Sequence, residues 1–78
     1  MLRCPCCNCL TIDDKMCPIV EICEVCYWQY DETAQDNPNK IIGPNSVSLN
    51  DARYNYKKFG ASDYRFKNHV RRPTYEEI

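Results

Sequence analysis

Four of the seven cysteines stand in two pairs, each with two residues between its members: Cys4 with Cys7, and Cys23 with Cys26. Fifteen residues separate the two pairs, which is the spacing of four-cysteine zinc sites. A short turn aims both thiolates of a pair at one point, and zinc binds four thiolates tetrahedrally. A site closed by four protein ligands is structural, because it leaves no position for substrate or water. The sequence therefore predicts a structural metal site at these four cysteines.

The other three cysteines leave the choice of ligands open. Cys6 and Cys9 form a second pair that overlaps the first, and Cys17 stands alone. Either Cys4 and Cys7 bind, or Cys6 and Cys9 replace them, or a larger cluster uses six or seven thiolates. The geometry of a metal-binding turn favours the first set. His69 is expected on the surface of a helix rather than at the metal, since four cysteines already complete the coordination.

Four thiolates do not fix the identity of the metal. Zinc is expected, but mononuclear iron and iron–sulfur clusters accept the same ligands, so an electron-transfer iron protein is an alternative function that visible absorption would reveal. A thioredoxin-like oxidoreductase is less favoured. Its cysteine pair opens a helix, whereas the residues after Cys26 are typical of a strand.

Length explains why the chain needs a metal. We expect 78 residues to form one domain, 1–78, whose core contributes only about 3–5 kcal/mol, against roughly 10–16 kcal/mol from structural zinc.

The first residues lack the pattern of a signal peptide, and no apolar run reaches the roughly 18 residues of a membrane span. We therefore expect a cytoplasmic protein away from membranes, with reduced cysteines that bind metal.

The pattern predicts a small α+β fold in which metal-stabilised, zinc-ribbon-like β-hairpins (about 1–31) are followed by one or two short helices. Strands are expected at 10–12, 19–22 and 27–30, where β-branched and aromatic residues cluster. Asn8 stands where the first turn needs a residue that tolerates positive φ. Trp28 is expected in the core beside the metal.

A loop is expected over 32–47, held to the ribbon by Ile41 and Ile42, and a helical part over 48–73. Ser48 is a typical N-cap, and Gly60 suits the C-terminal end of the same helix. A second short helix is expected over 63–70, capped by Asp63, with a loose tail over 74–78.

The charge is unevenly distributed although the net charge is only −1. Seven acids and one base lie between residues 13 and 36, whereas seven bases and one acid lie between 53 and 72. The two halves could attract each other, or each could bind a partner.

A protein-binding module would use the acids Asp31, Glu32 and Asp36. A nucleic-acid-binding ribbon would use bases together with Tyr54 or Tyr64; these bases are Arg53, Lys57, Lys58, Arg65, Arg71 and Arg72. The near-neutral total charge favours the protein partner, and the absence of an activated nucleophile argues against an enzyme.

Three motifs in order make the chain similar to the cysteine-rich CPCC family of small bacterial proteins. They are Cys4-Pro5-Cys6-Cys7, the run from Glu21 to Trp28 around the second cysteine pair, and the residues Asn45, Val47, Ser48, Leu49, Ala52, Arg53 and Asn55 followed by Phe59-Gly60-Ala61. The resemblance extends from about Cys4 to Pro73. It implies metal binding by Cys4, Cys7, Cys23 and Cys26, no catalytic residues, and a possible role as an immunity or adaptor protein. The chain departs from the family pattern at Asn8 (usually glycine), Glu24 (often proline) and Cys9 (usually aromatic).

Overall fold

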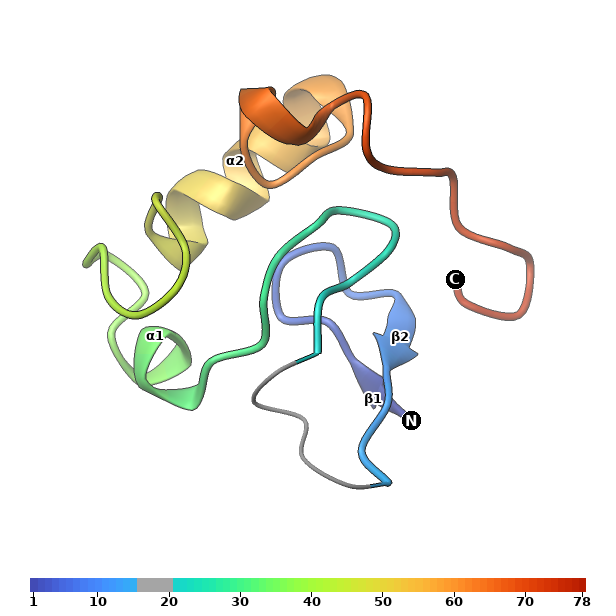
Figure 1. Cartoon of the computed structure of the whole chain (residues 1–78), viewed down its shortest axis with the longest axis horizontal. Coiled ribbons are helices and arrows are strands. Elements are labelled where there is room, and N and C mark those ends of the chain that lie inside the picture. The colour runs from blue at the N-terminus through green and yellow to red at the C-terminus, as the bar shows by residue number, and fades with distance from the viewer. Residues whose placement is uncertain (16–20) are drawn as a thin grey trace.

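The computed structural model describes residues 1–15 and 21–78. Its elements are β1 (Leu2–Arg3), β2 (Leu10–Ile12), α1 (Glu32–Asp36), α2 (Leu49–Phe59) and the 3₁₀ helix η2 (Tyr64–Phe66) (Figure 1). β1 and β2 pair antiparallel, with Leu2 opposite Ile12 and Arg3 opposite Leu10. A two-stranded hairpin with two α-helices and a cysteine cluster confirms the predicted small α+β class. No helix in the described ranges is long and apolar enough to cross a membrane.

The second cysteine pair lies in a hairpin that is less regular than the predicted ribbon. In the described part of the chain, the pairing of its two arms is a single antiparallel bridge between Ile22 and Gln29. The predicted strand over 27–30 is reduced to this bridge, because Tyr27 has a φ of 69° and closes the turn, so that only the residues after it pair with the other arm. Residues 19 and 20 of the predicted strand over 19–22 lie outside the described residues.

Helix α2 begins and ends where its sequence signals predict. The Ser48 hydroxyl accepts a hydrogen bond of 3.1 Å from the backbone N–H of Asp51, which satisfies one of the free donors of the first turn. Gly60 ends the helix in the left-handed region, with a φ of 84°. Leu49 and Ala52 are buried, which confirms that this face of the helix contributes to the core.

The segment 32–47, predicted to be a loop, contains α1. Asp31 caps this helix by accepting a hydrogen bond of 3.0 Å from the N–H of Ala34. The prediction missed a helix of five residues because it treated Asp31 as part of an acidic surface. Asp31 is only 9% exposed, so it serves the fold, and Glu32 and Asp36 alone remain as exposed acids of that surface.

The Asn45 amide, and not Ile41, connects the rest of this segment to the second hairpin, whereas Ile42 is half-buried. The Asn45 side chain accepts from the Gln29 N–H at 3.0 Å and donates to the Gln29 carbonyl at 2.9 Å, as a neighbouring strand would. Ile41, which was expected to hold the loop in place, is 68% exposed.

The C-terminal segment is more tightly held than the sequence suggested. The helix expected over 63–70 is reduced to η2, although Asp63 caps it as predicted. The residues expected to be a loose tail return to the first hairpin, where the Leu10 N–H donates to the Glu77 carbonyl at 2.7 Å. Arg71 forms ion pairs with Glu77 at 2.7 Å and Glu24 at 3.0 Å. The Arg71 guanidinium lowers the pKa of Glu77 to about 2.

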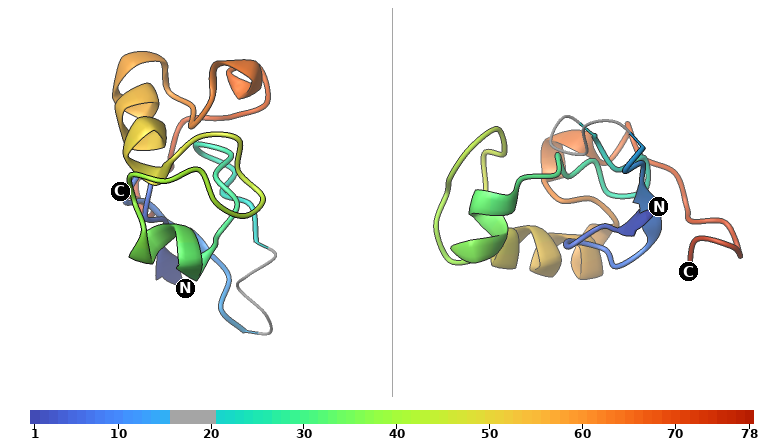
Figure 2. Two further views of the ribbon diagram at one scale, coloured as in Figure 1. Left: turned by 90° about the vertical axis from the view of Figure 1, so that its left-hand side faces the viewer. Right: turned by 90° about the horizontal axis from the view of Figure 1, so that it is seen from below.

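The core is small and centred on the cysteines. Trp28 is fully buried, as predicted, and the other large buried side chains are Ile12, Leu49 and Val25. The molecule measures 31 × 29 × 16 Å, and α2 lies along one side of the two cysteine-bearing turns (Figures 1 and 2). A core this shallow has little apolar surface to bury, so other interactions must help to hold the chain together.

The two glycines of this fold provide a test of the capping of α1. Gly43 has a φ of 77°, and a Cβ placed there would lie 2.6 Å from Oδ2 of Asp31. Gly60 has a φ of 84°, but nothing lies within 4 Å of its Cβ position. We expect Gly60→Ala to cost about 1 kcal/mol of unfolding free energy from backbone strain, and Gly43→Ala about 1 kcal/mol more from displacement of the cap. Urea unfolding of the metal-loaded proteins measures both. Equal losses would contradict the role given to Asp31.

Candidate metal centre

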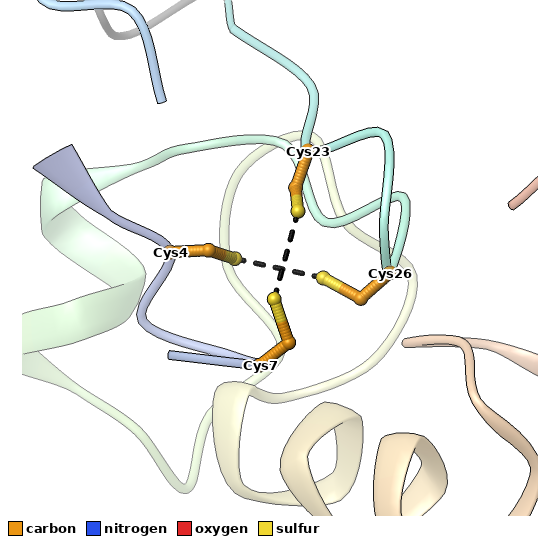
Figure 3. A group of neighbouring side chains, drawn as sticks. All are labelled: Cys4, Cys7, Cys23 and Cys26. Atoms are coloured by element: carbon orange, nitrogen blue, oxygen red, sulfur yellow. Dashed lines mark hydrogen bonds between the residues drawn. The ribbon is translucent and has the colours of Figure 1, made fainter. Parts of the chain in front are cut away.

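The first cysteine pair lies in a tight turn closed by two backbone hydrogen bonds. The Cys4 N–H donates to the Cys9 carbonyl, and the Asn8 N–H donates to the Cys4 carbonyl, both at 2.8 Å. Asn8 has a φ of 64°, which confirms the prediction that this position needs a residue tolerant of the left-handed region. The turn brings the side chains of Cys4 and Cys7 to the same side (Figure 3).

The second cysteine pair repeats the same turn. The Cys23 N–H donates to the Trp28 carbonyl at 2.9 Å, and the Tyr27 N–H donates to the Cys23 carbonyl at 2.7 Å. Tyr27 therefore takes the place of Asn8, with a φ of 69°. A side chain in this region costs roughly 1–2 kcal/mol. The Tyr27 ring packs against Phe66, with 4.6 Å between the ring centroids, which offsets part of that cost.

The two turns face each other and bring the four predicted ligands together. The sulfurs of Cys4, Cys7, Cys23 and Cys26 all lie within 4.8 Å of one another. Two short contacts join one turn to the other, Cys4 to Cys26 at 3.5 Å and Cys7 to Cys23 at 3.6 Å (Figure 3). A tetrahedron with metal–sulfur bonds of 2.3 Å has edges of about 3.8 Å. The four sulfurs could therefore hold a metal ion.

The alternative ligands lie outside this group. Cys6 and Cys9 are buried in the core, and the Cys9 thiol donates to the Cys7 carbonyl at 3.8 Å. By the hydrogen bonds of the two turns, Cys9 occupies the place that Trp28 fills in the second turn, which is a core position. His69 is exposed and lies beside the Tyr27 ring. Cys17 lies outside the described residues.

Crowding of the thiols controls their protonation. Hydrogen bonding to Cys23 raises the pKa values of Cys4, Cys7 and Cys26, and hydrogen bonding from Cys26 and the others lowers the pKa of Cys23. Three of the four thiols therefore hold their protons more tightly than an isolated cysteine does. A bound ion must displace those protons, so its affinity falls as the pH is lowered.

A neighbour of the sulfurs that sequence reasoning missed is Thr11. Its Oγ1 lies 2.9 Å from the Sγ of Cys23. Thr11 belongs to β2, which follows the first turn, whereas Cys23 belongs to the second. The sequence analysis predicted only a strand residue at this position, because no spacing rule connects a threonine to a cysteine twelve positions later.

Helix α2 lies beside the first turn and carries basic residues there. Arg53 Nε donates to the Pro5 carbonyl at 2.9 Å, so this base contributes to the packing of α2 on the turn. A cavity of about 370 Å³ lies between α2 and the first turn. It is lined by Pro5, Cys6, Cys7, Asn8, Arg53, Tyr56 and Lys57. Burial and the nearby Cys9 raise the pKa of Tyr56 to about 12.

Comparison with known proteins agrees with this arrangement. The family model described as Cysteine-rich CPCC matches residues 2–77. No curated protein and no solved structure matches the chain. The family match covers both cysteine pairs, α2 and the C-terminal segment. The chain belongs to the cysteine-rich CPCC family.

Proposed function

We propose that this chain is a non-catalytic protein-binding module whose fold depends on one structural zinc ion bound by Cys4, Cys7, Cys23 and Cys26. The observation that carries the proposal is the convergence of four sulfurs from two separate turns to within 4.8 Å. Four thiolates complete a tetrahedral zinc site and leave no ligand position for water or substrate. This favours a structural over a catalytic role.

The spacing of the sulfurs favours a single ion. In a [4Fe–4S] cluster each thiolate binds a different iron atom, and in a [2Fe–2S] cluster two thiolates bind each of two iron atoms. Both arrangements spread the four sulfurs further apart than the 4.8 Å within which all four lie here. A mononuclear iron site has the same geometry as zinc. Zinc is the proposed metal because a redox-inactive ion suits a site whose role is to hold two turns together.

The energetics explain why the ion matters. A chain of 78 residues has a core worth about 3–5 kcal/mol, whereas structural zinc contributes roughly 10–16 kcal/mol. Without the ion, three of the four thiols are buried beside one another. Metal loss should therefore unfold the turns, and the docking of α2 and the C-terminal segment should fail with them.

Substitution of single cysteines tests the metal site. Native mass spectrometry of protein purified without added metal should show one zinc ion per chain. Cys26→Ser should lose the ion, because three thiolates bind structural zinc much more weakly than four. Cys9→Ala is the matched control, because it removes a buried cysteine that is not a ligand, and should keep one ion.

Two results would contradict this assignment. Retention of stoichiometric metal by Cys26→Ser would show that other residues bind the ion. Iron in the purified wild-type protein, together with absorption in the visible, would show that the site holds iron rather than zinc and would favour an electron-transfer function.

The surface that best suits a protein partner lies beside the second turn. A groove of about 520 Å³ is lined by Ile22, Glu24, Tyr27, Asn68, His69, Val70 and Arg71. Ile22 is 42% exposed, and the ion pair between Glu24 and Arg71 lies at the same groove. Apolar and charged side chains line this groove together, and protein interfaces combine both kinds. A role as a small immunity or adaptor protein would use such a surface.

Two isoleucines test this surface. Ile22→Lys should weaken binding of a co-purified protein partner at least tenfold, because it introduces a charge at the apolar part of the groove. Ile41→Lys introduces the same charge at a residue that is 68% exposed on another segment, and should leave binding unchanged. Titration calorimetry with the purified partner measures both. Equal affinities for the two variants would place the interface elsewhere.

Exposed aromatic residues favour nucleic-acid binding as a second candidate function. Tyr54 and Tyr64 are 62% and 64% exposed. Lys58 lies 5.8 Å from the centre of the Tyr54 ring, and Lys67 lies 4.8 Å from that of Tyr64. Rings flanked by cations are typical of single-strand binding surfaces. This candidate ranks second because Arg65 and Arg71 already pair with acids of the chain.

Salt dependence distinguishes the two candidates. A nucleic-acid-binding protein should bind a fluorescent single-stranded oligonucleotide at about 50 mM salt, and its affinity should fall steeply at about 200 mM. Tyr64→Ala should reduce that affinity further. No binding at the lower salt concentration would eliminate this candidate.

A further inference from the structure

We propose that Thr11 is a positioning residue of the metal site, whose hydroxyl donates a hydrogen bond to the Cys23 sulfur and thereby strengthens metal binding. The proposal rests on the metal site proposed above and adds a residue outside the four ligands. Its basis is the distance of 2.9 Å between Thr11 Oγ1 and Cys23 Sγ.

The hydroxyl has one proton to donate and two acceptors within reach. The second is the Cys9 carbonyl, at 3.4 Å from Oγ1, which is long for an O–H···O bond. The shorter contact and the negative charge of a metal-bound thiolate both favour the sulfur, because hydrogen bonds to charged acceptors are the stronger ones. We therefore assign the proton of Thr11 to Cys23.

The position of Thr11 explains how it could act on the metal. Thr11 is half-buried in β2, the strand that leaves the first turn, whereas Cys23 opens the second turn. The hydrogen bond thus links the two turns from outside the coordination sphere. Cys23 is fully buried, so its thiolate depends on protein donors rather than on water for stabilisation. Such partners of a metal ligand typically contribute about 10- to 100-fold in affinity.

Three substitutions test the proposal. Thr11→Val keeps the β-branched shape and removes the hydroxyl, and Thr11→Ser keeps the hydroxyl. Thr33→Val is the matched control, because Thr33 is an exposed threonine of α1. Competition with a chromophoric chelator should give a zinc affinity roughly 10- to 100-fold lower for Thr11→Val, with near wild-type values for Thr11→Ser and Thr33→Val.

A spectroscopic measurement separates positioning from a general loss of stability. In the Co²⁺-loaded proteins, the sulfur-to-cobalt charge-transfer band should move to longer wavelength in Thr11→Val, because a thiolate without its hydrogen bond gives up an electron more readily. The band of Thr11→Ser should stay in place. This reading uses only protein that has folded and bound metal, so partial unfolding of the variant does not affect it.

The outcomes are distinct. If wild-type protein binds neither zinc nor Co²⁺, the proposed metal site is wrong and the role of Thr11 falls with it. If wild-type protein binds metal but Thr11→Val matches it in affinity and in band position, the metal site stands and the role of Thr11 is overturned.

Discussion

The structure depends on four thiols from two separate turns being held within 4.8 Å of one another. Thiols have little reason to cluster on their own, since their mutual hydrogen bonds are weak and their negative charge accumulates as they ionise. An ion of charge +2 at the centre reverses this balance, because each thiolate then becomes a favourable ligand. We therefore expect the cluster to be unfavourable without metal and, once an ion is bound, to stabilise the fold more than any other interaction.

The other parts of the fold are arranged around that centre. The two turns share one pattern of backbone hydrogen bonds and place a residue in the left-handed region at the same point. Arg53 ties α2 to the first turn, and the C-terminal segment reaches β2 through Glu77 and the second turn through Arg71. An ion bound there would fix the relative position of the turns and, with it, the surfaces formed between them and the helical part, including the groove at Ile22.

Sequence reasoning succeeded where a local rule has one physical solution. The spacing of the cysteine pairs predicted which four sulfurs meet, Ser48 and Gly60 predicted the ends of α2, and Asn8 predicted a left-handed residue. It failed where tertiary contacts decide the outcome. Tyr27 has strong strand propensity, yet the second turn holds it at a φ of 69°. Tertiary constraint here overrides propensity.

Asp31, Glu77 and Thr11 show the same limit in another way. Because other acids lie near it in the sequence, Asp31 was assigned to an acidic surface. Its carboxylate instead caps α1, a helix that was missed because the residues around it are typical of a loop. Glu77 lies in a polar tail, and only the position of Arg71 in space makes it an anchor. Thr11 contacts a sulfur of the other turn, and no local rule predicts a contact between residues so far apart in the chain.

The most direct test of this account is a zinc titration of the metal-free protein, followed by the backbone amide signals of both turns and of α2 in ¹H–¹⁵N NMR spectra. The account predicts a poorly dispersed metal-free spectrum that converts to one set of folded signals, complete at one equivalent of zinc. Well-dispersed signals for the two turns and α2 before any metal is added, unchanged at one equivalent, would contradict it.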